Sequence, residues 1–415
     1  METEDLFRRH QSVATSGFSR DAYKPGLDAM RCIDALLGRP SAAFRSIHVA
    51  GTNGKGSVSS MLAASLAATG LRVGLFTSPH LIDYRERMKI VSNGTFGMIS
   101  KEDTRGFLDS YEKGMDGLTF FEVTTAMAFW WFARQEVDIA VIEVGLGGRL
   151  DSTNIIIPEL SVITSIGLDH CALLGETRAK IASEKAGIFK NGVPALVWGH
   201  DPETDPVFEK AASASGSPLH YADSIPFEPE STIASMDLKS PSQKENLRTV
   251  IAALGLLGVK PDIETLCNTA AITGLHGRWE NIQTVTPAGR KVTLILDIGH
   301  NPAALESNLS LVKDKVIIVY GVMADKDYST NIRLLPADAE FILCAPDTPR
   351  ALPADELSKA FREIAPDAKT HCAGSVAKAV DTALETADDS GIRTILIIGS
   401  TFVVSEAAKH LGLYD

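Results

Sequence analysis

The chain has 415 residues, of which 45% are hydrophobic and 22% are charged, and its formal net charge is −12. The length suggests two or three domains, and the composition is close to the average for globular proteins. The negative charge argues against a non-specific nucleic-acid binder, which would need a basic face.

Apolar runs that read as strands alternate with helical patterns along most of the chain. In the first part, the strand-like runs are RSIHVAG, RVGLFTS, DIAVIEVG, LSVITSIG and VPALVWG. Helical patterns include SVSSMLAASLAAT, FFEVTTAMAFWWFARQ and ENLRTVIAALGLLG. Strands rich in Val and Ile with helices between them predict a parallel sheet covered on both faces. Region 200–245 is polar and irregular, and we assign no structure to it.

A domain boundary is expected near residues 283–291, QTVTPAGRK, because this segment is short and polar and contains Pro and Gly. After it the alternation restarts with KVTLILDIG, KVIIVYG, AEFILCAP, DAKTHCAG and RTILIIGS. We therefore predict an α/β fold with two domains. The first, over residues 1–288, has a mostly parallel sheet, and a smaller α/β domain covers residues 289–415.

Residues 1–20 carry charges throughout and no run of about 18 apolar residues occurs, so we expect neither a secretory leader nor a membrane-spanning helix. The five cysteines are scattered and form no C-x-x-C pair: Cys32, Cys171, Cys267, Cys344 and Cys372. Such a set is typical of reduced thiols in a cytoplasm. We expect a cytoplasmic protein, take it to be a monomer, and interpret Cys171 as a bystander thiol.

The stretch HVAGTNGKGSVSS resembles a phosphate-binding loop with altered spacing. Gly51 stands three residues before Gly54, and Gly56 separates Lys55 from Ser57, whereas the standard pattern has four intervening residues and no glycine after the lysine. A strand precedes the glycines and a helix follows them, so backbone N–H groups and a helix N-terminus would point at one anionic group. The alternative is a strand-to-helix turn that needs glycine for backbone reasons, with Lys55 solvated.

The motifs AGTNGKGS, LFTSPHL, VIEVGLGGRLDSTN, GLDH, EKAGIFK, GRWE and DIGHNP occur in this order. Together they resemble the folylpolyglutamate synthase/dihydrofolate synthase family, a branch of the Mur ligases, from about residue 20 to the C-terminus. In this family a glycine stands between the lysine and the serine of the loop. The resemblance implies an ATP-binding P-loop domain like the Mur ligase central domain, then a Rossmann-like glutamate-ligase domain, closing over a cleft.

The resemblance also implies the reaction. The ATP γ-phosphoryl group moves to a substrate carboxylate, and the amine of L-glutamate attacks the acyl phosphate. The acid is dihydropteroate or the γ-carboxylate of a reduced folate such as tetrahydrofolate. Each step brings anions together, so the site must supply positive charge in fixed positions.

The resemblance implies nucleotide contacts from three parts of the chain. They are Thr52, Asn53, Gly54, Lys55, Gly56 and Ser57, then Asn246 on the adenine side, and then Arg278 and Asp297. The catalytic residues that it implies are Lys185, Arg278, Asp297 and His300. A guanidinium binds phosphoryl oxygens bidentately, which a lysine cannot do. The sequence departs mildly from the family at Ile298 and Gly299, which puts the local loop shape in question.

Two Mg²⁺ ions are implied. Glu143 ends a strand near the phosphate loop, where a carboxylate is well placed to hold Mg²⁺. By resemblance Ser78 supplies a hydroxyl to the first ion and His170 binds the second, although residue chemistry alone would favour Asp169. The resemblance further implies that Lys185 is carbamylated by CO₂, which would turn a cation into an anionic ligand of the second ion.

The pterin-bearing substrate is expected along two segments, again by resemblance. They are Thr119, Phe120, Phe121 and Glu122, and then Leu150, Asp151 and Ser152. The adjacent aromatic rings could stack on a flat heterocycle, although we expect one of the two to be core. Candidates for glutamate contacts are GVMADKD, Ser400 and Thr401.

Two alternatives stay open. Another Mur-type ligase could act on a different carboxylate, such as a peptidoglycan precursor, but cell-wall ligases resemble GKTT where this chain has GKGS. An ATP-driven switch would form no amide. It would need the phosphate loop and the metal ligands, but not Arg278, Asp297 and His300 together.

Overall fold

The computed structural model describes residue 24, residues 26–226 and residues 230–414. The chain forms two compact units. The first comprises Met1–Asp237 and Gln243–Leu275, and the second comprises Leu238–Ser242 and His276–Asp415. The prediction of two α/β domains is therefore confirmed, but the boundary that we expected at residues 288/289 lies at 275/276 instead.

The misplaced boundary has a simple physical cause. Strands β9 (Glu280–Val285) and β10 (Lys291–Leu296) pair antiparallel, so the polar segment between them is a hairpin turn and not a linker. Its Gly289 has φ 81°, the left-handed backbone conformation that favours glycine. Hairpin turns and linkers use the same residue types, and composition alone did not separate them.

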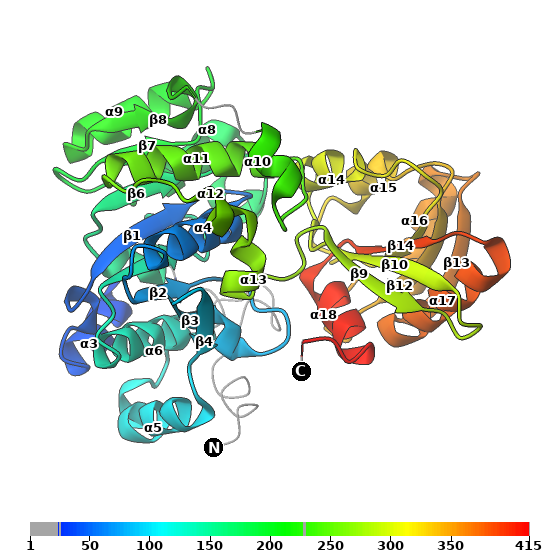
Figure 1. The fold of residues 1–415 in the computed structure, drawn as a ribbon, viewed down its shortest axis with the longest axis horizontal. Coiled ribbons are helices and arrows are strands. Elements are labelled where there is room, and N and C mark those ends of the chain that lie inside the picture. The colour runs from blue at the N-terminus through cyan, green and yellow to red at the C-terminus, as the bar shows by residue number, and fades with distance from the viewer. Residues whose placement is uncertain (1–23, 25, 227–229, 415) are drawn as a thin grey trace. The chain divides into compact units, whose positions relative to one another are not determined.

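The first unit contains an eight-stranded sheet with the strand order β4-β3-β2-β5-β1-β6-β7-β8 (Figure 1). Its strands are β1 (Arg45–Ala50), β2 (Val73–Phe76), β3 (Met88–Ser92), β4 (Thr95–Met98), β5 (Ile139–Glu143), β6 (Leu160–Ile163), β7 (Ala195–Val197) and β8 (Leu219–Tyr221). All five predicted strands are present. The sheet is parallel except at one edge, where β3 and β4 run antiparallel.

The helices of the first unit cover both faces of this sheet. They are α3 (Asp28–Leu36), α4 (Lys55–Ala67), α5 (Lys101–Tyr111), α6 (Phe120–Arg134), α7 (Cys171–Leu174), α8 (Arg178–Ala186), α9 (Asp205–Ser215), α10 (Glu230–Ser235), α11 (Gln243–Leu256), α12 (Ile263–Cys267) and α13 (Thr269–Thr273). Short 3₁₀ helices are η1 (Pro40–Ala42), η2 (Tyr84–Arg87), η3 (Glu112–Gly114), η4 (Ser152–Ile155) and η5 (Ala222–Ser224). Region 200–245, which we left unassigned, contains α9, β8, η5 and α10.

Alternation along the central strands divides the core of this unit. Ala140 and Ile142 of β5 pack with α3, α5 and α6, while Ala50 of β1 packs with α8 and α9. The alternate residues of these strands face the opposite side of the sheet. On that side α4 contacts the sheet, and α11 and α13 contact α4 in turn. Helix α4 is buried over nearly its whole length, because its Ala and Ser side chains are small enough to fit between two layers.

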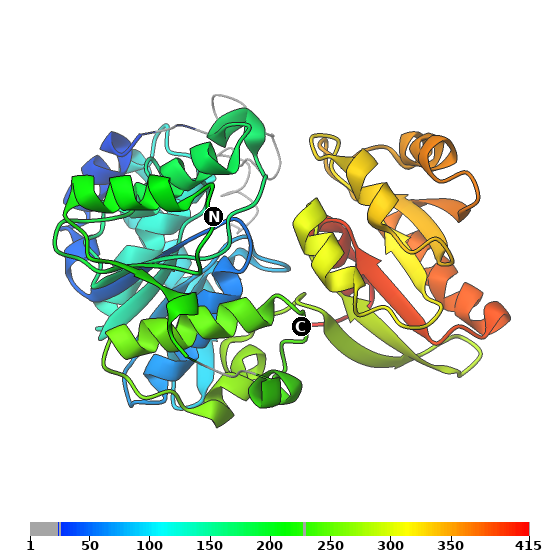
Figure 2. The ribbon, with the colours of Figure 1, turned by 90° about the horizontal axis from the view of Figure 1, so that it is seen from above.

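The second unit is a six-stranded sheet with the order β13-β12-β11-β14-β10-β9, parallel except for the edge strand β9. Its other strands are β11 (Ile317–Tyr320), β12 (Glu340–Ala345), β13 (Lys369–Ser375) and β14 (Thr394–Ile398). Its helices are α14 (Pro302–Leu309), α15 (Tyr328–Leu334), α16 (Ala354–Ile364), α17 (Val376–Ser390) and α18 (Thr401–His410). Figure 2 shows these helices on both faces of the sheet. All five predicted strands are present here too.

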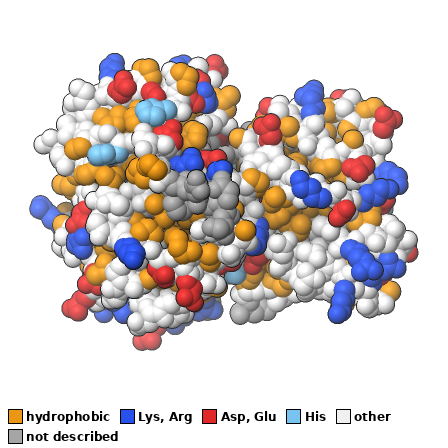
Figure 3. Space-filling view, turned by 45° about the horizontal axis from the view of Figure 1, so that its top comes forward, with side chains coloured by type: hydrophobic (Ala, Val, Ile, Leu, Met, Phe, Trp, Pro, Cys, Tyr) orange, Lys and Arg blue, Asp and Glu red, His pale blue; other side chains and the backbone are white. Residues whose placement is uncertain are grey.

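Charged side chains of both signs are interspersed on the visible face of each unit (Figure 3). Within the described residues, no helix has both the length and the apolar character needed to cross a membrane.

Lys89 on β3 holds the end of α13. Its side chain is buried, and its Nζ donates hydrogen bonds to the carbonyl oxygens of Thr273 and Gly274 at 2.8 and 2.7 Å. The ammonium also lies 5.0 Å from the centre of the Phe96 ring. Burial lowers the pKa of Lys89 to about 8, an effect that Glu86 only partly offsets. This lysine therefore fixes the last turn of the first unit.

We predict that replacing Lys89 by Met changes how the free energy of unfolding depends on pH. Between pH 8 and 10.5, a lysine with this lowered pKa binds fewer protons in the folded chain than in the unfolded chain. As pH rises through this window, the wild-type protein should therefore gain stability relative to Lys89→Met, by at most about 3 kcal/mol. Urea unfolding of both proteins across the window measures the difference, and a constant difference would contradict the prediction.

Candidate functional site

The predicted site residues of the first unit follow three adjacent parallel strands. Strand β1 lies between β5 and β6, with Val49 opposite Glu143 and Ala50 opposite Ile163. The carboxyl ends of these strands are therefore level with one another. In open α/β sheets this edge is where ligands bind.

The phosphate loop lies between β1 and α4, as the sequence predicts. A Cβ atom at Gly51 would lie 1.7 Å from the hydroxyl oxygen of Thr164, so only glycine fits here. Gly54 is the N-cap of α4 and has φ 85°. Lys55, Gly56 and Ser57 form the first turn of α4, so their backbone N–H groups have no acceptor within the helix. They supply positive partial charge at this end of the helix.

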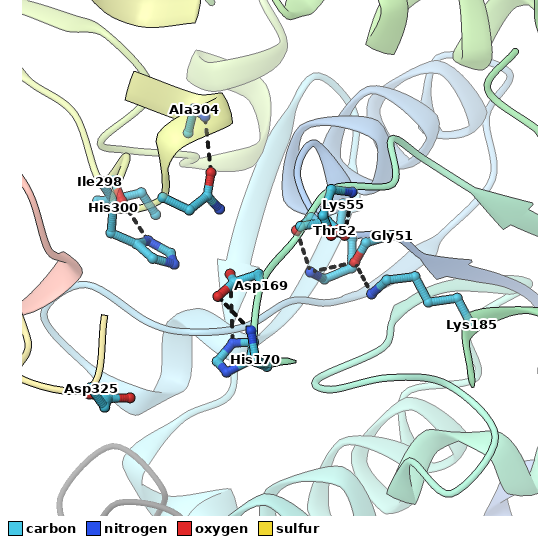
Figure 4. Close-up of polar contacts among 12 residues, drawn as sticks. Gly51, Thr52, Lys55, Asp169, His170, Lys185, Ile298, His300, Ala304 and Asp325 are labelled. Carbon is cyan, nitrogen blue, oxygen red and sulfur yellow. Dashed lines mark hydrogen bonds and ion pairs between the residues drawn. The ribbon is translucent and has the colours of Figure 1, made fainter. Parts of the chain in front are cut away.

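Two lysine side chains converge on one carbonyl of this loop (Figure 4). Lys55 Nζ donates to the carbonyl oxygens of Gly51 and Thr52 at 3.1 and 3.2 Å, and Lys185 Nζ donates to the Gly51 oxygen at 2.6 Å. Lys185 comes from α8, far along the chain. The structure thus brings together two residues that the sequence predicted separately.

Lys185 is almost fully buried. Burial lowers the pKa of Lys185 well below its ordinary value, and the charge of Lys55 lowers it further. Nearby Asp169 and Asp151 act in the opposite direction without restoring it. The environment therefore favours the neutral amine of Lys185.

The loop after β6 is bound to the phosphate loop. Thr52 donates its N–H to the carbonyl of Ser165 at 2.8 Å, and its hydroxyl bonds to the backbone of Gly167 at 3.0 and 3.1 Å. Three residues further on, His170 has φ 51°, and its N–H donates to the Asp169 carboxylate at 2.8 Å. The Thr52 contacts place this loop next to the phosphate loop.

Glu143 and Ser78 are also brought together. Glu143 is buried, and its Oε2 accepts the N–H of Ser78 at 2.8 Å. Carboxylate and hydroxyl oxygens are ligands that Mg²⁺ prefers, so this pair fits the predicted ion. In the described part of the chain, no group of three or more His, Cys, Asp or Glu side chains lies close enough to hold a metal. The predicted set contains only two residues of those types.

Arg87 is a buried cation within electrostatic reach of Glu143 that the sequence analysis did not name. Its guanidinium is buried, donates to His80 Nδ1 at 2.9 Å and lies 5.2 Å from the centre of the Phe120 ring. Burial lowers the pKa of Arg87 to about 10, against the opposing charges of Glu143 and Glu86. In the sequence YRER it reads as one of several surface charges, so only the fold reveals its burial.

Asn246 and Gln243 lie on α11 behind the phosphate loop. Asn246 Nδ2 donates to Gln243 Oε1 at 2.9 Å, and Gln243 Nε2 contacts the Ser57 hydroxyl at 3.4 Å. A Cβ atom at Gly54 would lie 2.2 Å from Asn246 Oδ1. The structure therefore places Asn246 against the loop itself, and it adds Gln243, which the sequence analysis did not name.

The first predicted pterin segment begins α6. Thr119 and Glu122 form a capping box, in which Glu122 Oε2 accepts the Thr119 N–H at 2.7 Å and Thr119 Oγ1 accepts the Glu122 N–H at 3.2 Å. Phe120 is buried in the core. Phe121 is half-buried and packs against Gly145, where an added Cβ would lie 2.4 Å from its ring. The expectation that one of the two rings is core is confirmed for Phe120, and Phe121 is only partly buried.

The second predicted pterin segment contains a buried polar chain. Asp151 accepts the N–H groups of Leu146 and Thr153 at 2.8 and 3.0 Å and also the Thr153 hydroxyl. His48 Nε2 lies 2.8 Å from the same hydroxyl. Burial raises the pKa of Asp151, and these hydrogen bonds oppose the shift. Asp151 thus shapes the glycine-rich loop, while Leu150 and Ser152 on either side of it are half-buried.

In the second unit, Asp297 organises the segment that carries Arg278. Its carboxylate is buried and accepts the N–H groups of Trp279 and Gly299 at 2.9 and 2.8 Å and Asn308 Nδ2 at 2.8 Å. Burial raises the pKa of Asp297, although these hydrogen bonds and the Arg278 charge oppose the shift. One carboxylate therefore joins the loop of Arg278 to the loop of His300.

Both the ring and the backbone carbonyl of His300 are hydrogen-bonded. Its Nδ1 lies 3.0 Å from the carbonyl oxygen of Ile298, which can only accept, so Nδ1 carries the proton. Its own carbonyl accepts Asn331 Nδ2 at 3.1 Å, and Asn331 is completely buried in α15. Asn301 caps α14 by accepting the Ala304 N–H at 3.0 Å (Figure 4).

The candidates for glutamate contacts have structural roles as well. Ser400 caps α18 by accepting the Phe402 N–H at 3.1 Å, so Thr401 is the first residue of that helix. In the GVMADKD segment, Asp325 binds Arg350 with both oxygens at 3.0 and 2.8 Å, and Asp327 caps α15. Nothing in this geometry selects one of them as a ligand.

Two domain families match the chain. Residues 49–252 match the Mur ligase middle domain, and residues 277–401 match the Mur ligase glutamate ligase domain. The gap between the two matches contains the unit boundary at 275/276.

Relatives match over most of the chain. The dihydrofolate synthase/folylpolyglutamate synthase of Bacillus subtilis is 34% identical, over 94% of this chain and 95% of its own length. A probable bifunctional folylpolyglutamate synthase/dihydropteroate synthase of Haloferax volcanii is 32% identical over 92% of this chain, and the chain spans about half (48%) of that relative.

Solved structures share the fold. Escherichia coli FolC in complex with DHPP and ADP has a TM-score of 0.80 at 27% identity, covering 99% of this chain and 96% of that chain. Mycobacterium tuberculosis folylpolyglutamate synthase with ADP and AMPPCP has a TM-score of 0.81 at 28% identity, covering 94% and 96%. A bifunctional synthase with Mn, AMPPNP and L-glutamate bound has a TM-score of 0.77 at 28% identity, covering 94% and 95%. The chain therefore belongs to the dihydrofolate synthase/folylpolyglutamate synthase family of Mur ligases and is an ATP-dependent ligase that forms amide bonds.

Proposed function

We propose that this protein uses ATP to join L-glutamate to dihydropteroate, to the γ-carboxylate of a tetrahydrofolate, or to both. The observation that carries the proposal is the convergence of Lys55, Lys185 and the N-terminus of α4 beside the strand-end carboxylate Glu143. This arrangement places the ammonium of Lys55 and the positive end of the α4 dipole where a triphosphate would lie, next to an amine at Lys185 that is shifted toward its neutral form. The relatives named for the same two activities support the choice of substrates.

The chain's own groups divide the work. The loop residues Thr52 to Ser57 would bind the phosphates through backbone N–H groups, with Lys55 moving from the loop carbonyls to the phosphate oxygens. Asn246, in the first turn of α11 and beside Gly54, would contact the nucleotide. Arg278 would bind the transferring phosphoryl group with its fork of N–H donors, and His300 would contact the acyl phosphate.

Ser78, Glu143, His170 and Lys185 would hold two Mg²⁺ ions. Bound there, the ions would neutralise charge that develops on the phosphoryl oxygens. Glu143 is already oriented by the Ser78 N–H, which leaves little side-chain freedom to lose on binding.

Lys185 would act as a carbamate. The neutral amine attacks CO₂, a C–N bond forms, and one proton leaves to solvent, so a neutral group becomes an anionic oxygen ligand. Burial of the amine beside Lys55 supports this step, because an ammonium at this position would repel both Lys55 and the metal ions.

The pterin ring would lie against Phe121, with Thr119, Glu122, Leu150, Asp151 and Ser152 shaping its surroundings. The half-buried ring of Phe121 supports this assignment, since its neighbour Phe120 is enclosed by the core. We place the activity in the cytoplasm, in keeping with five free cysteines, and propose that the protein acts as a monomer.

The first test is product formation. We expect ADP release to require Mg²⁺, glutamate and either dihydropteroate or tetrahydrofolate, with the acid gaining the mass of one glutamyl residue. Mass spectrometry and a coupled ADP assay measure this. ADP released at full rate without glutamate or acid would favour an ATP-driven switch. Turnover with a different carboxylate only would favour another Mur-type ligase.

The second test addresses the carbamate. We predict that Lys185→Ala abolishes turnover and that a short carboxylate such as propionate partly restores it, because the acid supplies the missing oxygen ligand. Wild-type activity should fall in CO₂-depleted buffer and recover with bicarbonate. Wild-type rates from Lys185→Ala would refute the carbamate.

The third test concerns the phosphate loop, with a matched glycine as control. Gly54→Ala should weaken ATP binding at least about tenfold, because the new methyl would collide with Asn246 as well as strain the backbone. Gly70, at φ 93°, has nothing within 4 Å of its would-be Cβ. Gly70→Ala should therefore lower the free energy of unfolding by about 1–2 kcal/mol, through backbone strain alone, while keeping the affinity for ATP. Calorimetric titration that finds equal affinities in the two variants would contradict the assignment.

A further inference from the structure

The segment that carries Arg278 has a strained backbone. Gly277 has φ 69° and Trp279 has φ 52°, so a bulky residue adopts a left-handed conformation directly after the arginine. Such a conformation persists only when surrounding contacts determine it. Those contacts therefore fix the position of the Arg278 backbone, from which its side chain extends.

Glu280 supplies the contacts on one side of the segment. Its Oε2 accepts the N–H of Gly277 at 2.8 Å, and its Oε1 lies 3.0 Å from His276 Nδ1. Asp297 holds the other side through the Trp279 N–H. The two carboxylates thus bind the backbone N–H groups immediately before and after Arg278.

Tyr414, after α18, completes the first of these carboxylate sites. Its hydroxyl donates to Glu280 Oε2 at 2.8 Å, which is the same oxygen that accepts the Gly277 N–H. Its ring lies on the His276 imidazole, with 3.8 Å between ring centres and 30° between planes. Burial raises the pKa of Glu280, but the hydrogen bonds from His276, Gly277 and Tyr414 outweigh it and lower the value.

We infer that Tyr414 is a positioning residue for Arg278, acting through Glu280 and His276. The Tyr414 hydroxyl fixes the Glu280 carboxylate, and the Tyr414 ring fixes the His276 imidazole. A residue near the C-terminal end of the described chain therefore holds two residues that flank Arg278. The role of Arg278 in phosphoryl transfer rests on the proposed function, whereas the effect of Tyr414 on the segment does not.

The closing experiment compares Tyr414→Phe with a control from the same part of the chain. Tyr414→Phe keeps the ring and removes only the hydroxyl. His410→Ala removes a 2.7 Å contact between α18 and Asp381 of α17 and leaves residues 276–280 unchanged. Glu280→Gln, which keeps an acceptor but loses its charge, provides a second route to the same disturbance if Tyr414→Phe folds poorly.

Hydrogen–deuterium exchange of residues 276–280 gives a readout that needs no substrate. We expect faster exchange in Tyr414→Phe and in Glu280→Gln than in wild type, and wild-type exchange there in His410→Ala. Unchanged exchange in Tyr414→Phe, or equal acceleration in the control, would overturn the inference whatever the protein catalyses.

Kinetics then test the link to Arg278. We expect Tyr414→Phe to lower kcat for amide formation about tenfold with little change in KM for ATP, because one charge-assisted hydrogen bond orients a group used in the transition state. In an Arg278→Lys background the same substitution should have almost no further effect, since the fork of donors is already gone. Independent, multiplying effects would refute the link to Arg278. A wild-type protein that forms no amide would instead refute the proposed function.

Discussion

The candidate site is organised around one atom, the carbonyl oxygen of Gly51, which accepts hydrogen bonds from both Lys55 and Lys185. Two amines meet there at the N-terminus of a helix, and one of them, Lys185, is buried. A second ammonium at this point would be unfavourable, because like charges repel and buried cations lose hydration, and the pKa of Lys185 is lowered accordingly. Phosphates at the loop and a carbamate on Lys185 would add the anionic oxygens that balance the charge of Lys55.

The sheet explains why these groups meet. Parallel strands place their carboxyl ends at one edge, so the loops after β1, β5 and β6 are neighbours even though the chain between them is long. Glu143 ends β5, Thr52 and His170 lie in the loops after β1 and β6, and Lys185 comes from α8. The topology therefore brings together the residues that we propose as ligands of the ions and of the phosphates.

Much of this was predictable from the sequence. The ten strands that we predicted are present, and most of them are buried parallel strands that read as Val- and Ile-rich runs. The half-exposed edge strands β4, β8 and β9 were missed because they lack that signal, and β3, which is buried and not at an edge, was missed as well. The unit boundary was wrong because a hairpin turn resembles a linker. The order of motifs predicted most of the residues that we discuss for the candidate site. The burial of Arg87 and the contacts of Gln243 with Ser57 and Asn246 depend on tertiary packing, which no local sequence pattern reports.

The predicted ligand residues also show a division that sequence could not resolve. Asp297, Asp151 and Glu122 have carboxylate oxygens that already accept backbone N–H groups, so each one shapes a loop whether or not it also touches a ligand. A carboxylate used in this way fixes the backbone of its loop, and this also fixes the position of neighbouring side chains. Arg278 lies between two such carboxylates, Asp297 and Glu280. The proposed role of Arg278 would therefore depend on two acidic residues that hold the backbone on either side of it.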